Sequence, residues 1–133
     1  MSLWTKDNQD WQRPCMITCA LSGVVANRAQ CPGIPYTPEE YAAEAKRAYE
    51  AGAAVVHVHA RKPDGSPSYD VEDYRLIRDA VVAACPIVVN FSTGAIGIST
   101  EQKTAHIRAL RPPIAALNMG SMNYAKWNKD KQA

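Results

Sequence analysis

Two histidines occupy the most apolar stretch of the sequence, at a spacing that lets both bind one metal ion. His57 and His59 lie in "VVHVHA" (55–60), which has the composition of a buried strand. Side chains of a strand alternate between its two faces, so both imidazoles share one face and Val56 and Val58 the other. Neutral imidazole is a common zinc ligand. The pattern predicts a metal site; the alternative is a pair of hydrogen-bonded histidines without metal.

A catalytic zinc ion takes three protein ligands, so the two histidines need a third. Asp64 lies in the turn after the strand and is a weak candidate. Cys19 is on an earlier strand, out of phase with its neighbours Thr18 and Ala20. We therefore expect the third ligand to lie outside these 133 residues, or the site not to be zinc. The third histidine, His106, falls in a predicted helix among basic residues and is expected at the surface.

The elements that must position these residues alternate between strand and helix. Strands are predicted at 15–21, 53–60, 87–92 and 114–121, and helices at 37–52, 69–85 and 100–111. Thr37 and Glu40 form a capping box at the start of the first helix, and Gly52 ends it. Continuous apolar strands separated by helices indicate a parallel sheet buried on both faces. This order fits an α/β fold, either an open doubly wound sheet or part of a (βα)8 TIM barrel.

Polar residues near the carboxyl ends of the predicted strands favour the barrel. They are Ser22, His57, His59, Asn90, Ser92 and Asn118. Barrel enzymes build their active sites on that rim. The loop after the first strand is not G-x-G-x-x-G and the sequence holds no Walker motif, which argues against a nucleotide-binding open sheet.

Composition narrows the classes of function. The chain has 133 residues, of which 47% are hydrophobic and 21% charged, as in one globular domain. A net charge of +2 with scattered basic residues favours neither nucleic acid nor a membrane surface. Four cysteines without a C-x-x-C pair predict reduced, mostly buried thiols in a cytoplasmic protein. Residues 1–14 are polar and are expected to form an N-terminal arm.

An ordered set of motifs resembles the β-keto acid cleavage enzymes, which include an enzyme of lysine fermentation. The motifs are "ITCALSG" (17–23), "PYTPEE" (35–40), "GAAVVHVHAR" (52–61), "DGSPS" (64–68), "NFSTG" (90–94) and "ALNMGSMN" (116–123). The resemblance implies a (βα)8 barrel with one zinc ion, in a homo-oligomer that is a tetramer in family members. It also implies a reaction in which a β-keto acid and acetyl-CoA give acetoacetate and a new acyl-CoA.

The resemblance assigns roles to further residues. His57 and His59 match the two zinc ligands, and Ser92 matches a serine that contacts substrate near the metal and is the catalytic candidate. Arg61 is expected to hold an anionic group of substrate or CoA, or else to form a surface ion pair. Plain turn chemistry is the alternative for Ser92 and Thr93. The full set of expected substrate-binding residues is Ser22, Val25, Arg61, Asn90, Ser92, Thr93, Gly94, Ala116 and Asn118.

The chain departs from the lysine-fermentation enzyme at two positions and in length. Val25 stands where that enzyme has a glutamate for the substrate's amino group, and Ala116 replaces a threonine, so we expect a substrate tail that is not a cationic amine. The family's chains are also longer, and their third zinc ligand (a glutamate), catalytic aspartate and an arginine lie in the second half. We therefore expect 15–133 to be the N-terminal half of a barrel domain, with about the first four βα units, within a longer product.

Two alternatives stay open at this point. Metal-dependent hydrolases of the amidohydrolase type also use H-x-H at a strand end, but normally on the first strand. The chain could also be a catalytically incomplete remnant or assembly module, which would bind zinc weakly and form no acetoacetate.

Overall fold

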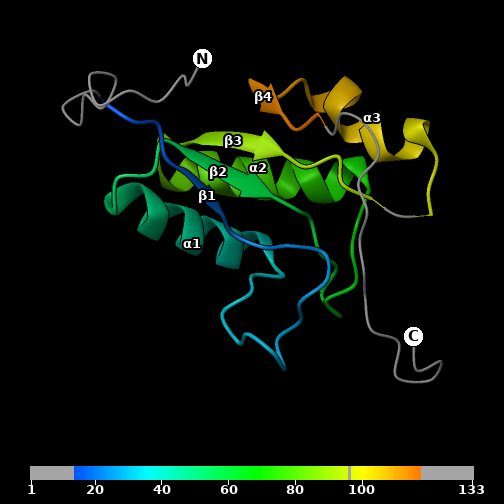
Figure 1. Ribbon diagram of the computed structural model, residues 1–133, viewed down its shortest axis with the longest axis horizontal. Coiled ribbons are helices and arrows are strands. Elements are labelled where there is room, and N and C mark those ends of the chain that lie inside the picture. The colour runs from blue at the N-terminus through cyan, green and yellow to red at the C-terminus, as the bar shows by residue number, and fades with distance from the viewer. Residues whose placement is uncertain (1–13, 96, 118–133) are drawn as a thin grey trace, which may run out of the picture.

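A computed structural model of the chain describes residues 14–95 and 97–117. Its elements are β1 (Thr18–Ala20), α1 (Pro38–Glu50), β2 (Val55–Val58), α2 (Val71–Ala84), β3 (Val88–Phe91), α3 (Thr100–Leu110) and β4 (Ile114–Ala115) (Figure 1). The predicted alternation of strand and helix is confirmed. Each strand is shorter than its apolar run, because a strand extends only as far as its neighbours offer backbone partners. The expected arm, except for Pro14, and the end of the fourth predicted strand lie outside the described residues.

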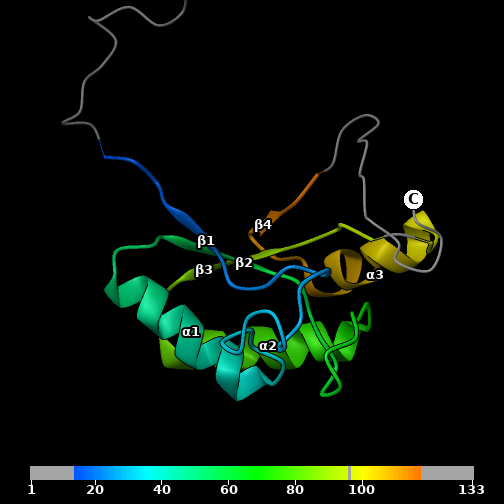
Figure 2. The same cartoon turned by 60° about the horizontal axis from the view of Figure 1, so that its bottom comes forward.

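The four strands form one parallel sheet in the order β1-β2-β3-β4. The helices lie along one face of this sheet, and within residues 14–95 and 97–117 no helix covers the other face (Figure 2). A doubly wound sheet has helices on both faces and a reversal in its strand order, whereas a barrel adds each strand beside the last. The observed winding is therefore that of a barrel. Our expectation of a sheet covered on both faces does not hold for the described residues, because they include only one layer of helices.

The core fills the space between the sheet and this layer of helices. Val56 and Val58 of β2 are completely buried in it, as the alternation predicts. On α2 the buried side is formed by Tyr74, Ile77 and Val81, whereas Val82 is 60% exposed. The other buried members of the cluster are Tyr41, Ala45, Ala53, Ala60, Cys85, Ile87, Val89 and Phe91.

Local sequence signals begin and end the helices where expected. Thr37 accepts a hydrogen bond from the Glu40 amide, and the Glu40 side chain accepts one in return, which completes the predicted capping box. Ser99 and Gln102 form a second capping box at α3. Gly52, with φ of 98°, follows α1 in the left-handed conformation that favours glycine.

Two expectations about burial are wrong. His106 was expected at the surface but is 0% exposed, because α3 turns this side chain inward onto the rings of Tyr74 and Phe91. The cysteines are free, as expected, but Cys15 and Cys31 are exposed because they lie before β1 and in the loop before α1. Among the described residues, no helix has the length and apolarity needed to cross a membrane.

Candidate metal and substrate site

The two histidines converge at the carboxyl end of β2. The Nε2 atoms of His57 and His59 lie 3.2 Å apart, and their rings meet edge to face at a centroid distance of 5.0 Å. His57 is in the strand, and His59 is the first residue after it, two positions further along the chain. Both imidazoles therefore lie on the sheet face away from the helices, opposite to the buried side chains of Val56 and Val58.

Asn90 fixes the orientation of the first histidine. This residue pairs with His57 across β2 and β3, and its Oδ1 atom lies 3.0 Å from Nδ1 of His57. Because an amide oxygen only accepts hydrogen bonds, Nδ1 carries the proton and the Nε2 lone pair of His57 is free to face His59. Metal-binding histidines are typically held in this way, with the second ring nitrogen donating to a carbonyl oxygen.

The geometry of this pair fits two ligands of one tetrahedral ion. Two nitrogens bound to the same zinc at about 2.0–2.1 Å lie about 3.3 Å apart. The observed separation of 3.2 Å is close to that value. Within residues 14–95 and 97–117, no group of three histidine, cysteine or acidic side chains is placed to hold a metal ion. Asp64 accepts hydrogen bonds from Ser66 in an exposed turn, and Cys19 packs toward the core, so neither supplies the third ligand.

Electrostatics keep the second histidine neutral at physiological pH. Burial, together with the nearby His57 and the positive charge of Arg61, lowers the pKa of His59 to about 4. A neutral imidazole is the form that binds a metal. The site therefore has a ligand that needs no deprotonation at pH 7.

Two hydroxyl groups hold the main chain at the second histidine. Tyr41 of α1 donates a hydrogen bond to the His59 carbonyl at 2.5 Å, and Ser22 donates to the same oxygen at 3.0 Å. Burial raises the pKa of Tyr41 to about 12, so its hydroxyl stays a donor. Ser22 was expected to contact substrate; its hydroxyl bonds to the His59 carbonyl, and substrate contact by it stays a prediction. Sequence reasoning missed Tyr41, whose position in an amphipathic helix indicated only a core residue.

The segment after β3 is tied to two neighbouring elements. The Ser92 hydroxyl accepts a hydrogen bond from the Gly94 amide at 3.1 Å. Serine side chains commonly stabilise turns in this way. Thr93 donates to the Ala116 carbonyl beyond β4 at 2.8 Å. His106 of α3 donates from Nε2 to the Ser92 carbonyl at 2.9 Å. These bonds bring Ser92, Thr93, Gly94 and Ala116 together at the rim, and substrate contact by them stays a prediction.

Arg61 serves as a clamp on two loops. It is 4% exposed and donates hydrogen bonds to the carbonyls of Gly23, Ala26 and Gly65. The alternative of a surface ion pair for Arg61 is therefore wrong, because its donors face backbone oxygens. Contact between Arg61 and an anionic group of the substrate stays a prediction. Val25 lies in the clamped loop and is 67% exposed. Asn118 lies outside the described residues.

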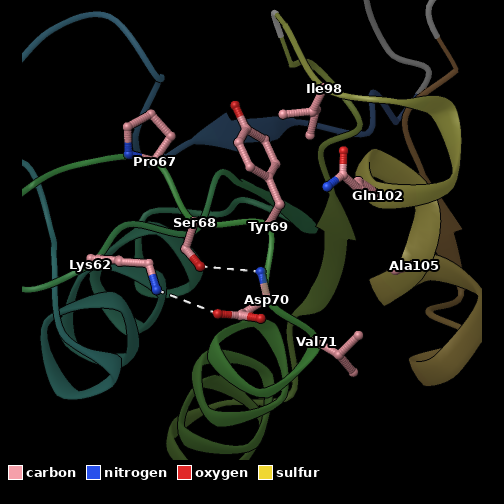
Figure 3. Close-up of a pocket in the computed structure, with 9 residues that line it drawn as sticks. All are labelled: Lys62, Pro67, Ser68, Tyr69, Asp70, Val71, Ile98, Gln102 and Ala105. Carbon is pink, nitrogen blue, oxygen red and sulfur yellow. Dashed lines mark hydrogen bonds and ion pairs between the residues drawn. The ribbon is translucent and has the colours of Figure 1, made fainter.

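A shallow pocket of about 390 Å³ lies on the outer side of the same rim (Figure 3). Its lining comes from the loop after β2, the start of α2 and the first turns of α3, and neither histidine of the pair belongs to it. Lys62 provides a positive charge there but lies 3.4 Å from Asp70 and 3.8 Å from Asp73. Because two carboxylates face this one cation, the pocket is not a preformed anion site.

The sequence is similar to proteins of one known family. A family model described as "beta-keto acid cleavage enzyme" matches residues 14–132. The 3-keto-5-aminohexanoate cleavage enzyme of Acetoanaerobium sticklandii is 38% identical over 111 residues, which are 82% of this chain and 40% of that protein. The 3,5-dioxohexanoate:acetyl-CoA acetone transferase of Paraburkholderia graminis is 36% identical over 117 residues, 85% of this chain and 37% of that protein.

A solved structure extends the likeness to the fold. ObcA, in a ternary complex with a C4-CoA adduct and oxalate, matches with a TM-score of 0.57 and 27% identity, over 68% of this chain and 24% of that chain. The predicted α/β class is confirmed, and the four-stranded sheet is part of a (βα)8 barrel. The chain spans about 40% of the length of the curated relatives it matches.

Proposed function

The chain belongs to the beta-keto acid cleavage enzyme family, and on this premise we propose that it forms part of a zinc-dependent enzyme that condenses a β-keto acid with acetyl-CoA. The products would be acetoacetate and a new acyl-CoA. The observation that carries the proposal is the convergence of the His57 and His59 imidazoles, with their Nε2 atoms 3.2 Å apart, on the barrel's carboxyl rim. Membership in this family also displaces the amidohydrolase alternative, whose H-x-H belongs on the first strand, whereas here it lies on β2.

In this proposal His57 and His59 hold the zinc ion, and a third ligand comes from outside the described residues. A bound zinc ion supplies a Lewis acid that polarises a carbonyl oxygen. Asn90 keeps the His57 lone pair directed at the ion by accepting the Nδ1 proton. The separation of 3.2 Å between the two ring nitrogens supports one shared ion over two separate ones.

Ser92 is the proposed contact for the substrate's carboxylate. Its Oγ atom accepts from the Gly94 amide at 3.1 Å, and no acceptor in the described part of the chain takes its own hydroxyl proton. A serine hydroxyl has one proton to donate, and an ionised carboxylate oxygen is a strong acceptor for it. Ser92 also lies level with His59 across the sheet. His57 pairs with Asn90 on β3, and His59 and Ser92 each follow two residues after these partners.

The proposed substrate tail is apolar and carries no ammonium group. Val25 and Ala116 stand where the lysine-fermentation enzyme is expected to have polar contacts, and neither side chain can pair with a cation. We expect the protein to turn over 3-oxohexanoate faster than 5-amino-3-oxohexanoate, measured as acyl-CoA formed with acetyl-CoA present. A clear preference for the amine would contradict this assignment.

The proposal is tested by metal content and acetoacetate formation in the same samples. His57→Ala and His59→Ala should each lose most bound zinc and all acetoacetate formation from β-keto acids and acetyl-CoA. Thr18→Ala is a matched control, because Thr18 is exposed on the adjacent strand and pairs with Val55, two residues before His57. Zinc binding that survives in both histidine variants would refute the proposed site. If the unmodified chain and Thr18→Ala also form no acetoacetate, the catalytically incomplete alternative is favoured. Location in the cytoplasm and assembly into a homotetramer are further expectations of this proposal.

A further inference from the structure

We infer that Tyr41 is a positioning residue for His59, acting through the main-chain carbonyl of that histidine together with the hydroxyl of Ser22. The inference rests on the proposed function in one respect, namely that His59 shares an ion with His57. It concerns a residue on α1, which lies on the far side of the sheet from the imidazole pair.

The carbonyl of His59 is the first one after β2 that the sheet does not hold. The two preceding carbonyls have backbone partners, because Leu21 donates to His57 at 3.2 Å and Ser92 donates to Val58 at 3.0 Å. At His59 the donors are side chains instead. Tyr41 donates at 2.5 Å and Ser22 at 3.0 Å, and their two hydroxyl oxygens lie 3.1 Å apart.

This arrangement fixes the peptide plane at the point where the histidine needs a fixed direction. A carbonyl that accepts two hydroxyl protons resists rotation about the adjacent backbone bonds, and that rotation would tilt the imidazole. A tilt of about 10–20° is enough to spoil a metal or catalytic constellation. The tolerance for a metal–ligand distance is about 0.2 Å. The separation of 3.2 Å between the two Nε2 atoms therefore depends on how firmly this carbonyl is held.

The hydroxyl of Tyr41 can be separated from the packing of its ring. Tyr41 is 0% exposed and belongs to the core cluster, so Tyr41→Phe removes only the hydrogen bond and keeps the ring. Tyr74 is the matched control. It is 2% exposed, comes from α2, and its hydroxyl lies beside the backbone of Ala60, one residue beyond His59. Both variants remove one buried hydroxyl that reaches the same segment, but only one of them releases the histidine.

The first measurement is zinc affinity, by competition with a chromophoric chelator at pH 7, for the full chain and the variants Tyr41→Phe, Ser22→Ala and Tyr74→Phe. Loss of a group that orients a ligand typically weakens metal binding 10- to 100-fold. We expect about tenfold weaker zinc binding for Tyr41→Phe, a smaller loss for Ser22→Ala because Tyr41 still donates, and less than a threefold change for Tyr74→Phe. Urea unfolding should show similar destabilisation of the two phenylalanine variants. Equal losses of affinity in both would reduce Tyr41 to an ordinary core residue and overturn the inference.

The second measurement is independent of metal and separates this inference from the proposed function. Long-range 1H–15N NMR spectra of the metal-free chain report the ring nitrogens of each histidine. Tyr41→Phe should shift the His59 ring signals and Tyr74→Phe should leave them in place. If the chain binds no zinc but the shift is seen, the positioning role stands and the metal assignment falls. If the His59 signals are unchanged in Tyr41→Phe, the positioning role is refuted whatever the zinc affinity.

Discussion

Replacing Asn90 by alanine should weaken metal binding at the histidine pair while leaving both ligands in place. The Asn90 amide oxygen lies 3.0 Å from Nδ1 of His57 and holds the proton on that nitrogen. Without this acceptor, His57 is free to carry its proton on Nε2, which is the nitrogen that faces His59 at 3.2 Å. A protonated Nε2 has no lone pair for a metal ion. The variant therefore populates a form of His57 that cannot bind zinc.

The size of this effect follows from the exposure of the bond. Loss of a hydrogen bond to a ligand histidine costs about 10- to 100-fold in affinity, or about 1.4–2.7 kcal/mol. Asn90 is only half-buried on the open face of the sheet, so a water molecule can take over part of its role. We therefore expect a loss near tenfold, with a fall of about 1 kcal/mol in the free energy of unfolding.

The assay is zinc affinity by chelator competition at pH 7, with urea unfolding of the metal-free chain in parallel. Asn90→Asp is the matched control, because a carboxylate keeps an acceptor opposite Nδ1 and strengthens the hydrogen bond. It should bind zinc at least as tightly as the unmodified chain. Affinity within twofold of the original in Asn90→Ala would refute the tautomer argument. So would an equal loss in both variants, since that would point to packing.

Three further variants test the layer of helices and the clamp. Burial lowers the pKa of His106, so the unfolded chain is protonated at this histidine before the folded chain is as the pH drops. As the pH is lowered below the unfolded pKa of about 6.5, the free energy of unfolding therefore decreases, by up to about 1.4 kcal/mol per pH unit. His106→Phe should flatten this part of the curve in urea titrations from pH 5 to 8, and parallel curves would contradict the assignment. Phe91→Ala should lower the free energy of unfolding by about 3–5 kcal/mol, because Phe91 is 0% exposed in the core. A decrease of less than about 1 kcal/mol would mean that this core is loosely packed. Arg61→Lys should lower the free energy of unfolding by about 2 kcal/mol and speed proteolysis in the loop at 23–26, because an ammonium cannot reach three carbonyls at once. An unchanged rate of cleavage would show that other contacts hold the loop.

The sequence could predict the features that follow from chain periodicity. Two residues two apart on a strand must share a face, so the meeting of His57 and His59 required only that the strand exist. The capping box at Thr37 and Glu40 is equally local, since its two hydrogen bonds join residues three apart. The winding of the sheet followed from the order of elements, once polar residues at the strand ends favoured a barrel.

The contacts that hold the site depend on packing between distant elements, and the sequence carries little signal for them. Tyr41 and His59 are 18 residues apart, and helical periodicity identifies Tyr41 as a core residue without naming a partner for its hydroxyl. His106 was placed at the surface because Lys103 and Arg108 flank it. The spacing of His106 and Leu110, four residues apart, was the available signal that they share the inward face of α3.

The structure divides the work of the site between the two faces of the sheet. The imidazoles lie on the opposite face from the buried Val56 and Val58. Two of the groups that hold the rim instead come from helices, which lie along the other face of the sheet (Figure 2). Tyr41 reaches the carbonyl of His59 and His106 reaches the carbonyl of Ser92, and in both cases an aromatic side chain bonds to the first carbonyl beyond the sheet's own partners. A strand end leaves such carbonyls without a neighbour, so a buried donor there both satisfies the backbone and fixes its direction. The helix layer can therefore set the geometry of the rim independently of what closes the open face. Variants of Tyr41 and His106 should change stability and site geometry together, whereas His57→Ala should remove most metal binding with little effect on the core.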